Sequence, residues 1–333
     1  MAIIGGLAVV ATSVAILGNR ATEKRSSDLE AERSLTQTRH GRIEYISWGE
    51  GPPVLVIHGA GGGFDQGRLL AMALGGTSSQ FVSVSRFGYL GSELPANPST
   101  AAQAEALLDL LDHLDIEKAT ILAMSGGVPP ALKFAEMFPD RTERMVLLSS
   151  APLTPFSPKV EDRPIPTWAY TSLLGNDAAY WALTKGARGP LRSAFDARAD
   201  LMVDISADEL WFVDHLIDGF LPASARLAGV ENEGAAVDPL AVYRLNGIRA
   251  PTLIVHARDD SLNPVEIGIE LASRIPEAQQ VIFERGGHLL LGHHAELRDR
   301  IGRFLANEQS PQTKRITTDS GAIFWFSFSE RML

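Results

Sequence analysis

Short apolar runs recur along this chain, and segments with helical spacing separate them. The clearest run is Pro-Val-Leu-Val-Ile-His at 53–58, and similar runs occupy 81–86, 119–124, 145–149, 252–256 and 280–283. Continuous apolar runs are typical of strands buried on both faces of a sheet, and their alternation with helices favours parallel strands joined by crossover helices. We therefore expect an α/β fold, built on a mostly parallel twisted sheet of about eight strands with helices on both faces.

Two departures from this alternation shape the expected organisation. Residues 33–38 and 42–48 alternate in polarity on either side of His40-Gly41, which predicts an antiparallel hairpin at the start of the sheet. Between Pro152 and Asp238 no buried strand is evident, although aromatic residues are frequent. We predict a helical insertion at 152–236 in a core made of residues 34–151 and 237–306.

Charge and cysteine content exclude several functions. Asp and Glu outnumber Lys and Arg by 40 to 30, a net charge of −10, whereas proteins that hold phosphate backbones need a basic surface. We therefore expect no nucleic acid partner. The chain has no cysteine, which excludes a thiol nucleophile, disulfides, iron–sulfur clusters and thiolate zinc sites.

The two ends differ from the core. Ala2–Gly18 carries no charge over 17 residues, and Arg20, Lys24 and Arg25 follow it. This length is at the lower limit for crossing a bilayer. We predict that residues 1–33 are an uncleaved membrane anchor and linker, with the following domain on the cytoplasmic side; an export signal or a soluble amphipathic start is the alternative.

The C-terminal segment 307–333 is polar except for Ile323-Phe324-Trp325-Phe326. We interpret it as a disordered tail with a sticky end or a short docking strand. A membrane-touching aromatic patch is the weaker alternative.

A serine stands where a strand should turn into a helix. Ser125 follows the apolar run 119–124 directly, and Gly126-Gly127 leads into the helical pattern that begins near Val128. A serine on such a turn is lifted above the sheet, provided that the residues two before and two after it are small. Ala123 and Gly127 meet that demand. In this motif the chain resembles the α/β-hydrolase family, whose usual pattern is G-x-S-x-G; Ala123 replaces the first glycine.

Three further segments extend the resemblance over about residues 34–306. The glycine-rich segment His58–Gly63 follows a buried strand, where the family has its oxyanion loop, and the resemblance implies Ala60 and Gly126 as the oxyanion donors. Asp260 precedes Pro264 at the position of the family's catalytic acid, with Asp259 as the runner-up. His288 follows the last core strand, at the position of the general base. The order Ser125, Asp260, His288 is that expected for this fold.

The resemblance implies a serine hydrolase that acts on a small molecule. His288 would take the Ser125 proton, Asp260 would orient the imidazole, and water would release the acyl-enzyme. We predict hydrolysis of a carboxylic ester or lactone, without a metal or organic cofactor. The same three residues would also serve a carbon–carbon bond hydrolase or a cofactor-free perhydrolase. A non-catalytic, membrane-tethered binding protein on this fold is a further alternative. The sequence assigns no oligomeric state.

Other residues receive secondary roles. The insertion resembles the family's helical cap, and its Trp168, Trp181 and Trp211, with Phe64 beside the glycine loop, are predicted to line the substrate pocket or simply to pack the cap. His293 and His294 are adjacent, but without a carboxylate cluster we interpret them as surface residues at a helix start. Arg86–Ser92 resembles a family loop with a structural role.

Overall fold

The computed structural model describes residues 2–76, 78–153, 172, 174–234 and 241–306, together with 316–317 and 323–324. Its central feature is an eight-stranded sheet in the order β1-β2-β4-β3-β5-β6-β7-β8. The strands are β1 (Ser34–Thr38), β2 (Gly41–Trp48), β3 (Pro53–Ile57), β4 (Gln80–Ser85), β5 (Ala119–Met124), β6 (Thr142–Leu148), β7 (Thr252–Ala257) and β8 (Gln279–Phe283).

The strand directions agree with the sequence prediction. β1 and β2 form the expected antiparallel hairpin, with Ser34 opposite Tyr45, and β2 also runs antiparallel to β4. From β4 to β8 every neighbouring pair is parallel. The α/β fold class with a mostly parallel sheet is therefore confirmed.

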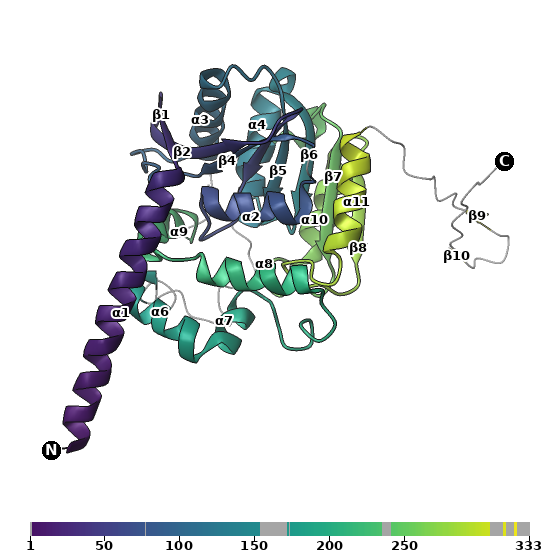
Figure 1. Ribbon diagram of the computed structural model, residues 1–333. Coiled ribbons are helices and arrows are strands. Elements are labelled where there is room, and N and C mark those ends of the chain that lie inside the picture. The colour runs from purple at the N-terminus through teal and green to yellow at the C-terminus, as the bar shows by residue number, and fades with distance from the viewer. Residues whose placement is uncertain are drawn as a thin grey trace.

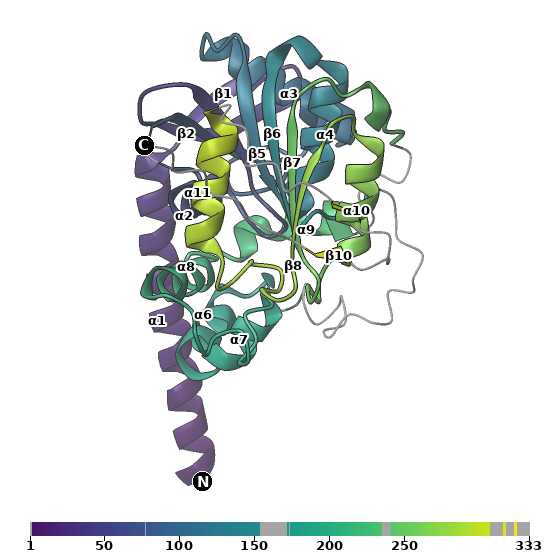
Figure 2. The same cartoon turned by 90° about the vertical axis from the view of Figure 1, so that its right-hand side faces the viewer.

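Helices cover both faces of the sheet (Figures 1 and 2). Apolar side chains of α3 (Thr100–His113), α4 (Val128–Met137) and α10 (Val265–Arg274) join one buried cluster with one face of the strands. On the other face, α2 (Phe64–Leu74) and α11 (His294–Leu305) contribute to a second cluster. Because both faces are covered, the parallel strands carry the continuous apolar runs seen in the sequence.

The insertion between β6 and β7 is helical where the structure describes it. It contains α6 (Asp177–Gly186), α7 (Arg188–Ala194), α8 (Ala207–Asp218) and α9 (Leu227–Gly234). Their buried side chains, including Tyr180, Phe212 and Phe220, form a third apolar cluster that also takes in Leu289 and Leu291 from the loop after β8. We refer to α6–α9 and their connections as the cap. It lies below the sheet in Figure 1.

A fully buried arginine fastens the cap to the glycine-rich loop after β3. Arg226 donates from Nη1 to the Gly62 carbonyl (2.8 Å) and from Nη2 to the Asp65 carboxylate (2.9 Å). It also donates to cap carbonyls, among them Phe220 O (2.8 Å) from Nε. This buried, multiply bonded ion pair fixes the position of the cap relative to the loop.

The N-terminal segment is one long helix, α1 (Ala2–Glu32). Its second half packs on the body: Leu29 is buried with Ile46 and Phe64, and Arg25 pairs with Asp65 (2.5 Å). Its first turns extend away from the rest of the chain (Figure 1). Within the residues that the structure describes, no helix is both long and apolar enough to cross a membrane. The predicted linker is the docked second half of this helix, and the membrane anchor stays a prediction.

In the C-terminal segment, β9 (Ile316–Thr317) and β10 (Ile323–Phe324) pair antiparallel with each other. Ile323 and Phe324, the first two residues of the apolar run predicted as a sticky end or docking strand, form β10. Trp325 and Phe326 lie outside the described residues.

Candidate active site

Ser125 stands on the turn between β5 and α4, as the sequence predicts. Its φ is +52°, in the left-handed region that a residue with a side chain rarely adopts, and residues 125–127 form one 3₁₀ turn. The residue two positions later must be a glycine for steric reasons, because a Cβ on Gly127 would lie 2.5 Å from the Ile57 carbonyl oxygen. The strained turn and the small neighbour are the features that raise a serine hydroxyl above a parallel sheet.

The glycine-rich loop after β3 lies against this turn. A Cβ added to Gly59 would be 3.2 Å from the Ser125 Cβ. Arg86 holds the loop from behind, donating from Nε to His58 O (2.9 Å) and from Nη2 to Gly59 O (3.0 Å). With these carbonyls engaged, the Ala60 N–H has no acceptor among the described residues. A free backbone donor beside the candidate nucleophile Ser125 is what an oxyanion hole requires.

His58 further stabilises the loop as a neutral imidazole. Its Nε2 accepts from the Arg86 N–H (3.0 Å), and its Nδ1 therefore donates to Gly59 O (2.6 Å). Burial lowers the pKa of His58 well below its usual value, and the positive charge of Arg86 lowers it further.

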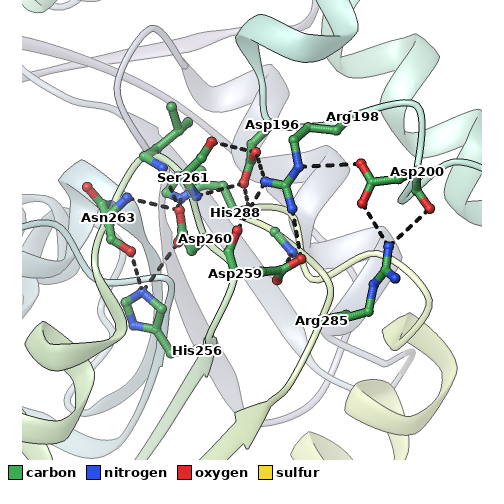
Figure 3. A network of polar contacts seen from close by, with 12 residues as sticks. Asp196, Arg198, Asp200, His256, Asp259, Asp260, Ser261, Asn263, Arg285 and His288 are labelled. Atoms are coloured by element: carbon green, nitrogen blue, oxygen red, sulfur yellow. Dashed lines mark hydrogen bonds and ion pairs between the residues drawn. The ribbon is translucent and has the colours of Figure 1, made fainter. Parts of the chain in front are cut away.

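Asp260 and His288 meet at the ends of β7 and β8 (Figure 3). His288 Nδ1 is 2.9 Å from Asp260 Oδ2 and 3.2 Å from Oδ1. Burial works against the charged form of both groups, but their mutual attraction and hydrogen bond outweigh it: the pKa of Asp260 is lowered and that of His288 is raised. Asp260 also accepts from the Leu262 and Asn263 N–H groups (2.9 Å each).

Asp259, the runner-up for the acid, faces another way. Its Oδ1 accepts from the Gly287 N–H (2.9 Å) and its Oδ2 from Arg198 Nη2 (2.8 Å). Asp259 therefore ties the loop after β7 to the loop after β8 and to the cap. The imidazole of His288 bonds to Asp260 instead, and the geometry favours Asp260 as the orienting acid.

An asparagine that sequence reasoning missed contacts the serine. Asn263 Nδ2 donates to Ser125 Oγ (3.3 Å) and to the Ser149 carbonyl (2.9 Å). Among the described residues, Ser125 Oγ has no hydrogen bond with His288. Hydrogen bonds between a nucleophile and its base are often long without substrate, so this arrangement is compatible with a triad. Asn263 lies three residues after Asp260, but no sequence pattern identified it.

A second missed residue reaches the site from the cap. Asp196 is fully buried and lies at the centre of the network in Figure 3. Its carboxylate accepts from the His288 N–H (2.7 Å), the Ser261 N–H (3.1 Å) and the Ser261 hydroxyl (2.5 Å), and it pairs with Arg198. Its negative charge also helps to raise the pKa of His288. One cap carboxylate thus connects the loops that carry Asp260 and His288.

The predicted pocket residues have other surroundings. Phe64 is buried with Leu29 and Ile46, and Trp181 packs in the apolar cluster of the cap. Trp211 is 43% exposed and lines a cavity of about 570 Å³ between α1, α2 and α8, which contains none of the three triad candidates. Trp168 lies outside the described residues. The contacts of Phe64, Trp181 and Trp211 lend no support to the predicted substrate-pocket role, which stays a prediction for Trp168.

The adjacent histidines after β8 bond to nearby backbone. His293 Nε2 lies 2.9 Å from Arg285 O, and the ring stacks on Phe283. His294 Nε2 lies 2.9 Å from Leu289 O, and this residue is only 3% exposed. The surface interpretation was therefore wrong for His294, which packs beneath the cap against Phe212.

Comparison with known proteins agrees with this architecture. A sequence model described as "Alpha/beta hydrolase family" matches residues 54–300, so the chain belongs to the alpha/beta hydrolase family. It is 30% identical over 270 residues to a 2-hydroxymuconate semialdehyde hydrolase of Pseudomonas putida, a match covering 78% of this chain and 87% of that protein. A 2-hydroxy-6-oxononadienedioate/2-hydroxy-6-oxononatrienedioate hydrolase of Paraburkholderia phymatum is 28% identical, with 83% and 92% covered.

Solved structures show the same fold. An alpha/beta hydrolase fold protein from Nakamurella multipartita superposes with a TM-score of 0.69 at 26% identity, over 82% of this chain and 98% of that one. A meta-cleavage product hydrolase from Pseudomonas fluorescens gives a TM-score of 0.58 at 23% identity, with 83% and 96% covered. The family and its hydrolase-named members establish that this chain is a hydrolase.

Proposed function

We propose that this hydrolase cleaves a carbon–carbon bond in a 2-hydroxy-6-oxo dienoate, with Ser125, His288 and Asp260 as its catalytic triad. The observation that carries the reaction type is the hydrogen-bonded pair of Asp260 and His288 in the same site as the strained Ser125 turn. The substrate class rests on the relatives, several of which are named for compounds of this kind.

The proposed reaction uses the triad twice. His288 Nε2 takes the proton of the Ser125 hydroxyl while Oγ attacks the C6 carbonyl carbon, and the Ala60 and Gly126 N–H groups stabilise the oxyanion. The step balances on the 2-oxo tautomer of the substrate, in which C5 already carries the proton of the 2-hydroxyl group. When the oxyanion collapses, the C5–C6 bond breaks, its electron pair is delocalised onto the C2 oxygen as a dienolate, and the dienolate takes the proton from His288. Water, deprotonated by His288, then attacks the acyl-enzyme and releases a carboxylic acid. Asp260 holds Nδ1–H throughout, which leaves Nε2 free to exchange the proton.

Ester or lactone hydrolysis, the first prediction from the sequence, uses the same machinery with an oxygen leaving group. The relatives named above favour carbon–carbon cleavage over it. Two solved esterase structures share the fold with this chain at 20% sequence identity, which is lower than the identity of the named relatives. A shared fold at that identity gives no ground for assigning their substrates to this chain.

The test is a substrate comparison on the purified protein. Loss of the dienolate absorbance of 2-hydroxymuconate semialdehyde and of 2-hydroxy-6-oxo-6-phenylhexa-2,4-dienoate is measured beside hydrolysis of p-nitrophenyl esters and lactones. We expect kcat/KM for a dienoate to exceed that for every ester by at least about 100-fold, the effect of about 2.7 kcal/mol in transition-state binding. Faster turnover of an ester or lactone would overturn the proposal.

Two controls identify the reaction. In H₂¹⁸O the carboxylic acid product should gain one ¹⁸O atom from the hydrolytic water. Ser125→Ala should lower kcat by about 10⁶-fold, as removal of the nucleophile does in other serine hydrolases, while the protein remains folded.

A further inference from the structure

One acidic side chain of the cap faces the nucleophile turn and has no role in the triad. Glu233 lies in the last turn of α9, which packs on the turn after β4: the Gly229 N–H donates to Gly88 O (2.9 Å), and a Cβ on Gly229 would meet the Tyr89 ring. Both ribbon views place α9 beside the end of the sheet nearer the cap (Figures 1 and 2).

The two carboxylate oxygens of Glu233 have different surroundings. Oε1 pairs with Nη1 of Arg86, the residue that holds the glycine-rich loop. Oε2 is buried and has no hydrogen-bond partner among the described residues. A Cβ on Gly126 would lie 2.9 Å from this Oε2 and 3.3 Å from the Ala60 backbone nitrogen. The unpaired oxygen and the Ala60 nitrogen therefore both lie beside Gly126 on the turn that carries Ser125.

The electrostatic surroundings of Glu233 decide which protonation state of its side chain suits this position. The groups that face it are Arg86 and Tyr89, both from the turn after β4, and His58 packs against Tyr89. Burial raises the pKa of Glu233 and outweighs the attraction of Arg86. An ionised carboxylate would repel the oxyanion formed at Ser125, whereas a protonated carboxyl can donate a hydrogen bond to it.

We propose that Glu233 is a further catalytic residue, whose protonated Oε2 donates a hydrogen bond to the oxyanion beside the N–H groups of Ala60 and Gly126. No proton is transferred in this step: the proton stays on Oε2 while the negative charge develops and collapses. The inference rests on the proposed use of Ser125 as nucleophile, but it does not depend on which substrate the enzyme cleaves.

The test measures acylation of the full-length protein by p-nitrophenyl acetate. Because this ester needs only the Ser125 nucleophile, the test can still be interpreted if the protein cleaves no carbon–carbon bond. The quantity is kcat/KM between about pH 5 and pH 9.5 for the wild type, Glu233→Gln and Glu233→Ala. Glu231→Gln, an exposed position on the same helix, is the matched control. Thermal unfolding of each variant is recorded in parallel.

We expect the wild-type profile to rise as His288 loses its proton and to fall again at higher pH as Glu233 loses its own. Glu233→Gln keeps a donor that does not titrate, so the alkaline fall should disappear and the variant should exceed the wild type at the highest pH. Glu233→Ala should lose about 100-fold in kcat/KM, typical of removing one oxyanion donor. Glu231→Gln should behave as the wild type.

A different result is expected if Glu233 serves only as a structural partner of Arg86. In that case the alkaline limb of Glu233→Gln matches the wild type, and both variants are destabilised because Arg86 is left without its counter-charge. That outcome, or a Glu233→Ala variant within about threefold of the wild type at every pH, would overturn the proposal.

Discussion

Replacing Asp196 by asparagine tests how the cap positions the catalytic loops. Asparagine keeps the shape of the side chain and tolerates the left-handed backbone at this residue (φ +60°). The substitution removes a charge and leaves one acceptor oxygen for donors from His288, Ser261 and Arg198. One buried donor left unpaired costs about 1–3 kcal/mol, and weakening the charged pair with Arg198 adds about 1 kcal/mol. We expect a loss of about 3 kcal/mol in the free energy of unfolding.

The same substitution should change the pH dependence of catalysis. The charge of Asp196 helps to raise the pKa of His288, so its removal lowers that pKa. Because His288 acts as a base only when neutral, the rising acidic limb of kcat/KM should move to lower pH. A role confined to packing the cap would not move this limb.

Urea unfolding and a pH series of kcat/KM with p-nitrophenyl acetate measure both effects. Asp200→Asn is the matched control, because Asp200 lies on the same loop as Asp196. Asp200 also pairs with arginines, Arg198 and Arg285, but its side chain is 56% exposed. It should cost less than about 1 kcal/mol. If Asp196→Asn unfolds within about 0.5 kcal/mol of the wild type and its acidic limb does not move, our reasoning about this residue is refuted.

Three further predictions concern the acid, the cap and the N-terminal helix. Asp260→Asn should lower kcat by about 10⁴-fold, because the imidazole tautomer is lost, whereas Asp259→Asn should stay within about tenfold; equal losses in steady-state assays would contradict our assignment. Arg226→Met should cost about 3–5 kcal/mol in urea unfolding, since it leaves a buried carboxylate with one partner fewer; a neutral effect would count against the anchoring role. Deleting residues 2–15 should leave the melting temperature within about 2 °C, whereas deleting 2–32 removes a buried leucine worth about 1.5–3 kcal/mol and should lower it clearly; equal melting temperatures would disprove the docking of α1.

Local sequence signals were sufficient for the parts of the site that lie on the core strands. The apolar run before Ser125 and the glycines after it define a strand, a turn and a helix within a few residues, and the structure has them there. Asp260 and His288 each follow a core strand, and parallel strands bring their carboxyl ends to one edge of the sheet. Their proximity therefore followed from the topology.

The residues that sequence reasoning missed reach the site over long chain separations. Asp196 and Glu233 belong to cap segments without a motif, and only the packing of the cap on the core brings them to His288 and Gly126. The uncharged run Ala2–Gly18 likewise gave no sign of how α1 docks, because the docking depends on contacts of the second half of the helix with Asp65 and the sheet. Such contacts leave no periodic signal in the sequence.

The central claim is that Ser125 is an activated nucleophile. The most direct measurement is reaction of the full-length protein with a fluorophosphonate, followed by intact mass and peptide mapping. We predict one adduct, on Ser125, that is lost in His288→Ala while the variant remains folded. A folded wild-type protein without an adduct, or with the adduct on another serine, would contradict the account.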